Sequence, residues 1–209
     1  MIAKHESFHA YNASRVRTLP DDILDRMVNA VERVRERLVR ASKALESAGV
    51  PYAIAGGNAV AAWVATVDPA AVRNTQDVDV LLRRPDFARA KLALESAGFV
   101  HRHAASLDLF LDSPSGNARE AVHIVFANEY IKAGEFAPSP DVAESQEGSG
   151  FRLLTLDALV RVKLTAFRRK DQVHLLDMIA VGLIDASWTA KLPTALAQRL
   201  QSLLDDPNG

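Results

Sequence analysis

The stretch NTQDVDVLL, residues 74–82, decides how this chain folds. It has the pattern of a β-strand, yet two carboxylates, Asp77 and Asp79, interrupt its apolar run. Because the side chains of a strand alternate with a period of two, both carboxylates face one side of the sheet, roughly 7 Å apart, and Val78 and Val80 face the other. Asp is disfavoured in strands, and two like charges about 5 Å apart repel by about 3 kcal/mol at an effective dielectric constant of about 20.

A divalent cation would explain why the fold keeps this pair. Mg²⁺ takes hard oxygen ligands and completes its shell with water or with substrate phosphates. A cation bound by Asp77 and Asp79 would therefore cancel their repulsion, whereas a solvent-exposed strand face would merely tolerate it. The pair predicts a metal site for Mg²⁺ or Mn²⁺, with simple exposure as the alternative.

A glycine pair lies upstream, in the stretch AGGN at residues 55–58, where a short apolar strand leads into a helix. Glycine lets the backbone approach a phosphate closely, and a helix N-terminus offers free N–H groups to an anion. A tight turn would use the same residues. If the two strands are neighbours, a triphosphate can lie on the turn while a metal joins it to the carboxylates, which suits phosphoryl or nucleotidyl transfer. Neither the dinucleotide-binding nor the P-loop fingerprint occurs.

Composition narrows the class of protein. The chain has 209 residues, a net charge of −1 and no cysteine, so disulfides and thiolate metal sites are excluded. A general nucleic-acid binder would be basic. No apolar run approaches the ~20 residues of a membrane span, and no secretory signal is visible. We therefore expect a cytoplasmic protein with no membrane contact.

The order of elements predicts an α/β (α+β) fold. A long helix ends at Gly49, and apolar strands, a second amphipathic helix and a hairpin follow it. These elements predict a small mixed β-sheet with flanking helices, and a helical part closes the chain. The expected boundaries are a disordered tail at 1–18, the sheet-containing core at 19–132, a linker at 133–150 and the helical part at 151–209.

At this point the sequence resembles a known family. The stretches GGNAVAAW and RNTQDVDVLL resemble the core motif of the polymerase-β-like nucleotidyltransferases. The arrangement Arg73-x-Thr75-x-Asp77-x-Asp79 is similar to the AbiEii-like nucleotidyltransferase group, many of whose members are bacterial toxins. The stretch VKLTAFRRKDQVHLLDMI, residues 162–179, also resembles that group. The resemblance covers roughly residues 45–182 and implies a nucleotidyltransferase-like core.

The resemblance implies a reaction and a set of site residues. The reaction is transfer of a nucleoside monophosphate from an NTP to the hydroxyl of an RNA, protein or small-molecule acceptor, and a cognate antitoxin or other partner protein is also implied. The implied catalytic residues are Asp77, Asp79 and Lys163, and the implied nucleotide-binding residues are Gly56, Gly57, Asn58, Thr75, Lys170 and Asp171. Lys163 and Lys170 share one face if their helix is continuous, and Asp171 could instead cap a helix.

One departure from the family pattern concerns the metal. The family usually carries a third carboxylate on a later strand, where this sequence has His123 in AVHIVFA. Histidine is a poor ligand for Mg²⁺ and a better one for Zn²⁺ or Mn²⁺. Glu120 and Glu129 are the nearby acids that could substitute, and His123 could also be an ordinary strand residue. Besides the enzyme, two readings therefore stay open: a nucleotide-binding pseudoenzyme, and a non-enzymatic protein that binds a partner through its N-terminal helix.

Overall fold

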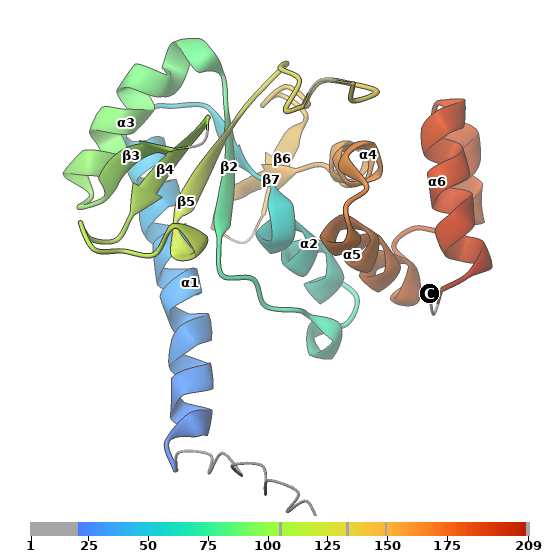
Figure 1. Cartoon of the computed structure of the whole chain (residues 1–209), viewed down its shortest axis with the longest axis horizontal. Helices are drawn as coiled ribbons and strands as arrows, with labels where there is room; N and C mark the ends of the chain where they lie inside the picture. Colours follow the sequence, from blue (N-terminus) through green and yellow to red (C-terminus); the bar gives the residue numbers. More distant parts are fainter. Residues whose placement is uncertain (1–20, 105, 133, 149, 208–209) are drawn as a thin grey trace, which may run out of the picture.

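The computed structural model describes residues 21–104, 106–132, 134–148 and 150–207 and shows the predicted mixed α/β architecture (Figure 1). The expected tail at 1–18 lies outside the described residues. Seven strands form one mixed sheet in the order β3-β4-β5-β2-β1-β7-β6. The strands are β1 (Tyr52–Ile54), β2 (Val78–Leu82), β3 (Val100–Ala104), β4 (Leu107–Leu111), β5 (Val122–Phe126), β6 (Ser145–Glu147) and β7 (Arg152–Leu154).

The helices cover both faces of this sheet. Helices α1 (Ile23–Ser47) and α3 (Phe87–Ser96) share one buried apolar cluster with the sheet. A second cluster joins the other face to α2 (Gly56–Ala65), α4 (Leu156–Ala166), α5 (Arg169–Ala180) and α6 (Thr194–Asp205). The described residues also form four short 3₁₀ helices: η1 (Pro69–Ala71), η2 (Arg84–Asp86), η3 (Ala118–Glu120) and η4 (Ala186–Lys191). None of the described helices is long and apolar enough to cross a membrane.

Strand β2 confirms the alternation predicted from its sequence. Val78, Val80 and Leu82 are fully buried in the cluster beneath α1 and α3. Leu81 belongs to the opposite cluster, beneath α2 and α4, and by strand periodicity Asp79 faces that side as well. Burial of one face by valine and leucine therefore fixes the register that turns the carboxylates toward α2.

Helix α1 ends where the sequence predicted, and Gly49 follows it with a φ of +61°. Only its second half packs on the sheet, through residues such as Leu38 and Leu45. The first half extends beyond the body of the molecule (Figure 1), and Met27 there is 60% exposed. The helical pattern of the sequence was correct, but it did not show that the apolar stripe outruns the sheet.

The structure contains the predicted hairpin, but the segment predicted as a linker contains a strand. Strands β4 and β5 pair antiparallel, as the hairpin prediction required. The range 133–150 was expected to be a linker, yet it contains β6, which pairs antiparallel with β7. Strand β7 in turn pairs parallel with β1, so this segment extends the sheet instead of only joining two parts. The division into two parts stays a prediction.

Candidate metal and nucleotide site

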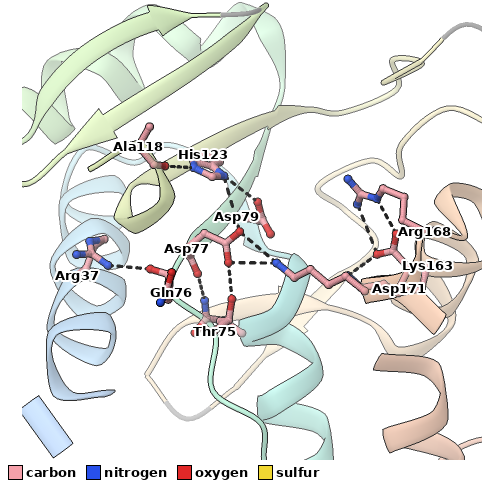
Figure 2. Close-up of polar contacts among 12 residues, drawn as sticks. Arg37, Thr75, Gln76, Asp77, Asp79, Ala118, His123, Lys163, Arg168 and Asp171 are labelled. Atoms are coloured by element: carbon pink, nitrogen blue, oxygen red, sulfur yellow. Dashed lines mark hydrogen bonds and ion pairs between the residues drawn. The ribbon is translucent and has the colours of Figure 1, made fainter. Parts of the chain in front are cut away.

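Three potential metal ligands converge at the start of β2. Strands β2 and β5 run parallel with Asp79 opposite His123, and Nδ1 of His123 lies 3.7 Å from Asp79 Oδ1 and 4.0 Å from Asp77 Oδ2. One ligand atom from each residue lies within 4.8 Å of the other two. Figure 2 shows the three side chains pointing toward one another. A single divalent cation fits this donor set, because two carboxylates and an imidazole are common ligands of such ions.

A backbone carbonyl orients the imidazole of His123. Nε2 lies 2.8 Å from the carbonyl oxygen of Ala118. Because a carbonyl oxygen only accepts hydrogen bonds, Nε2 carries the hydrogen and donates this hydrogen bond. Nδ1 is thereby turned toward the two carboxylates. The Asp79 carboxylate raises the pKa of His123 against the opposing effect of burial, with help from Ala118 and Asp77. Metal-binding histidines use this same outer hydrogen bond to a carbonyl.

Asp77 is held ionised by its neighbours. The Thr75 hydroxyl donates to one of its oxygens, and the Lys170 ammonium lies 3.2 Å from the other. Burial by itself raises the pKa of Asp77, but Thr75 and Lys170 outweigh it and hold the pKa below its usual value. The side chain of Asn58 donates to the backbone carbonyl of Asp77 at 2.7 Å. Thr75, Asn58 and Lys170, each implied as nucleotide-binding, therefore lie around the carboxylate.

The glycine pair lies directly against these acids, as the prediction of neighbouring strands required. Gly56 opens α2 with a φ of +61°, and a Cβ at that position would lie 1.7 Å from Asp79 Oδ2. A Cβ on Gly57 would lie 2.9 Å from the Cβ of Thr75. Only glycine allows the helix start to approach the carboxylates so closely. The first N–H groups of a helix have no partner within the helix, so they are available to an anion held beside the metal.

Lys163 and Lys170 do not share one helix face, because the helix is not continuous. Phe167, with a φ of +46°, ends α4, and α5 begins two residues later. Lys170 at the start of α5 reaches Asp77, whereas the ammonium of Lys163 is buried and lies 3.0 Å from Asp171. The condition on which a common face depended is therefore not met.

Asp171 acts as a helix cap. Its carboxylate accepts from the backbone N–H of Arg168 at 3.2 Å and from the guanidinium of the same residue at 2.7 Å. This is the alternative that the sequence left open, and the contact with Lys163 adds to it (Figure 2). Burial lowers the pKa of Lys163, and Asp171 opposes that effect. The roles implied for Lys163 and Asp171 in catalysis and nucleotide binding stay predictions.

The alternative acids do not join the three-ligand group. Glu129 forms an ion pair with Arg84 at 2.5 Å, and Glu120 lies in η3. One supporting residue, Arg37 of α1, was not predicted from the sequence. Its side chain is 3% exposed, and its guanidinium donates to the backbone carbonyl of Gln76 at 3.0 Å and to the carboxylate of Asp112. Gln76 directly precedes Asp77 in the chain. A charged residue inside a packed helix face was the only available signal.

Comparison with known proteins identifies the fold. No protein-family model matches the sequence, and no curated protein does so either. An antigenic nucleotidyltransferase-like protein from Paracoccidioides brasiliensis superposes with a TM-score of 0.56 and 15% identity, over 86% of this chain and 91% of that one. The antibiotic-resistance factor ANT(2'')-Ia superposes with a TM-score of 0.47 and 14% identity, over 88% of this chain and 93% of that one. A putative nucleotidyltransferase from Helicobacter pylori superposes with a TM-score of 0.45 and 17% identity, over 91% of this chain and 80% of that one. The chain has a nucleotidyltransferase-like fold.

Proposed function

We propose that this protein is a metal-dependent nucleotidyltransferase that moves a nucleoside monophosphate from an NTP to an acceptor hydroxyl. The observation that carries the proposal is the position of Gly56 against Asp79, with Asp77 and His123 within ligand distance of the same point. A phosphate-binding helix start and a three-ligand metal group thus meet on one face of the sheet. The resemblance to the polymerase-β-like family and the fold both support this arrangement.

The reaction needs little covalent chemistry from the protein. The acceptor oxygen forms a bond to the α-phosphorus, and the bond from that phosphorus to the bridging oxygen of the β-phosphate breaks. Pyrophosphate leaves with the electron pair, and the hydroxyl proton passes to solvent. The chain contributes positioning: the N–H groups at the start of α2 hold the phosphates, and Asp77 and Asp79 hold the cation, Mg²⁺ or Mn²⁺. When bound, such a cation neutralises phosphate charge and orients the reacting group.

Lys170 links metal binding to phosphate binding. Its ammonium lies 3.2 Å from a carboxylate oxygen of Asp77. In the absence of a metal ion, Lys170 therefore neutralises the charge of this carboxylate. Because the cation and the ammonium interact with the same group, cation binding weakens this ion pair. Lys170 is then available to pair with the phosphates of the nucleotide. The surrounding charges therefore favour joint binding of metal and NTP over either alone.

A melting experiment tests the nucleotide site. The wild-type protein and Asp77→Ala are heated with each of the four NTPs, with and without Mg²⁺ or Mn²⁺. A ligand at about 100 times its dissociation constant adds about 2.7 kcal/mol of stability, a shift of several degrees for a chain of this size. We expect a shift that requires metal and that Asp77→Ala abolishes. A wild-type protein whose melting temperature responds to none of the nucleotides would refute the proposal.

The same site can be tested for turnover and for a toxin-type role. Pyrophosphate release in the presence of candidate acceptors separates an active enzyme from the pseudoenzyme that His123 in place of a carboxylate favours. The pseudoenzyme predicts metal-dependent NTP binding with no release. Growth arrest on expression, lost in Asp77→Ala, would support the toxin role that the AbiEii-like resemblance implies. A second protein that relieves this growth arrest when it is co-expressed would be a candidate antitoxin.

A further inference from the structure

A pocket of about 610 Å³ opens beside His123. Strand β5, which carries His123, borders β2 on one side, and β1, which leads into Gly56, borders β2 on the other. The pocket begins at Thr75 and Asp77, next to the glycine turn, and extends toward β5 and β4, away from β1. Its walls come from the β3–β4 hairpin, from η3, from the segment before β2 and from α5. The lining residues that matter to the argument are Thr75, Asp77, Leu107, Leu109, Arg119 and His123.

The position of the pocket matches the geometry of the proposed reaction. In nucleotidyl transfer the attacking and leaving oxygens lie roughly in line on opposite sides of the phosphorus. With the phosphates at the start of α2, pyrophosphate leaves on the β1 side of the carboxylates. The attacking hydroxyl must then approach from the β5 side, where the pocket opens next to Asp77 and His123. This step rests on the proposed function.

The charged side chains of the pocket wall disfavour a ligand that carries several positive charges. Asp77 is the only carboxylate in the described wall of the pocket, and it already faces Lys170 and the metal position. Arg119 and Lys170 are the cations of the wall. The guanidinium of Arg119 is exposed and forms no ion pair or side-chain hydrogen bond within the described part of the chain. An anionic group on the ligand would give this guanidinium a partner, whereas an ammonium would meet repulsion.

One side of the wall, formed by β3, β4 and η3, carries apolar side chains, and the described wall contains no phenylalanine, tyrosine or tryptophan. Leu107 is 43% exposed and Leu109 is almost fully buried, and Ala104 and Ala118 lie beside them. These side chains can cover an apolar body, and the one ring in the described wall, the imidazole of His123, faces the two carboxylates. The wall therefore lacks the row of aromatic side chains on which successive nucleic-acid bases stack. The volume lies within the range of small-molecule sites. The wall therefore fits a small molecule better than a strand of nucleic acid.

We propose that this pocket binds the acceptor, and that the acceptor is a small hydroxylated molecule with an apolar body and an anionic group. Its anionic group pairs with Arg119, its body lies on Leu107 and Leu109, and its hydroxyl points to the metal position beside His123. The hydroxyl oxygen bonds to the α-phosphorus as the bond to the β-phosphate oxygen breaks, pyrophosphate takes the electron pair, and the proton goes to solvent.

Three probes with the same body test the chemical class. They are 4-(hydroxymethyl)benzoate, the neutral 1,4-benzenedimethanol and the cationic 4-(hydroxymethyl)benzylamine, titrated by NMR into the full chain without metal or nucleotide. We expect the benzoate to bind about three- to fivefold more tightly than the neutral probe, the scale of an exposed charge pair. The amine should bind more weakly than both. Equal or tighter binding of the amine would overturn the proposal.

Variants assign the binding to the pocket. Arg119→Gln should bring the benzoate down to the affinity of the neutral probe, and Leu107→Ser should weaken all three. Arg26→Gln, at the far end of α1, removes the same charge away from the pocket. This control should leave the affinities of all three probes unchanged. An unchanged benzoate preference in Arg119→Gln would refute the role of the guanidinium.

Nucleotide binding separates this inference from the proposed function. NTP with Mn²⁺ should leave the benzoate bound, because Arg119, Leu107 and Leu109 lie on the β5 side of the carboxylates and the glycine turn lies on the β1 side. Displacement of the benzoate by NTP would show a nucleoside pocket and overturn the inference. Metal-dependent NTP binding without probe binding would contradict only this inference. Probe binding in a protein that binds no NTP would contradict only the proposed function.

Discussion

Replacing Gly56 with alanine is the sharpest test of the site, because the chain contains its own control. Gly56 and Gly49 both have a φ of +61°. A Cβ on Gly56 would meet the carboxylate of Asp79 at 1.7 Å, whereas a Cβ on Gly49 would have nothing within 4 Å. The two substitutions therefore impose the same backbone strain, and only one of them displaces a proposed metal ligand.

The expected magnitudes follow from this difference. A residue with a Cβ in the left-handed region costs about 1–2 kcal/mol, so Gly49→Ala should lower the melting temperature by a few degrees. Gly56→Ala bears that cost and the cost of a forced shift in a packed region, about 1–3 kcal/mol more. Because Asp79 must move, its metal affinity should fall by about 10- to 100-fold, the scale seen when the surroundings of metal ligands are disturbed.

The assay measures stability and metal binding on the same samples. Urea denaturation gives the free energy of unfolding, and titration with Mn²⁺, followed by electron paramagnetic resonance, gives the affinity. Gly49→Ala should bind Mn²⁺ as the wild-type protein does. If Gly56→Ala retains wild-type Mn²⁺ affinity, or loses no more stability than Gly49→Ala, then the close approach of α2 to Asp79 does not control the site.

Three further predictions concern charged side chains. His123→Asp replaces an imidazole ligand with a carboxylate, so competition titrations should show the preference for Mn²⁺ over Mg²⁺ falling by about tenfold or more; an unchanged ratio would remove His123 from the metal shell. Burial and the ammonium groups of Lys163 and Lys170 lower the pKa of His174 to about 4. Since the unfolded chain takes up this proton near pH 6.5, stability present above that pH should fall by up to about 3 kcal/mol as the pH drops to 4. Urea titrations across this range should show the loss, and His174→Leu should lack it. Lys163→Met removes one partner of the buried Asp171, which keeps its contacts with Arg168, and should cost about 1.5–3 kcal/mol in the same assay; a loss below about 1 kcal/mol would contradict the buried ion pair.

The elements that depend on neighbours in the sequence could be predicted. The alternation in NTQDVDVLL placed Val78 and Val80 in the core and turned the two acids toward the other face, and the structure confirms that Val78 and Val80 are buried. Gly49 ends α1 as expected, since a left-handed residue stops a helix whatever lies elsewhere in the chain. Strand β6, within the range 133–150, was not predicted, because it has three residues and its pairing with β7 is not visible as a local pattern.

The composition of the site depended on packing between distant segments. His123 comes to the carboxylates only because β5 pairs with β2 in a register that sets it opposite Asp79. Lys170 reaches Asp77 across 93 positions of sequence, because the chain turns at Phe167 and starts a new helix there. From the sequence, Lys163 had looked equally able to point into the site, yet it is buried against Asp171.

The physical reason for this division is the range of the forces involved. Side-chain alternation, glycine turns and helix stops act over a few residues, so the sequence by itself determined the strand with its two carboxylates and the helix start with its two glycines. Distances between charges on separate elements depend on how those elements pack. The tertiary structure alone therefore decided that an imidazole lies beside the two carboxylates, that Lys170 pairs with Asp77 while Lys163 pairs with Asp171, and that a pocket with Arg119 opens beside them.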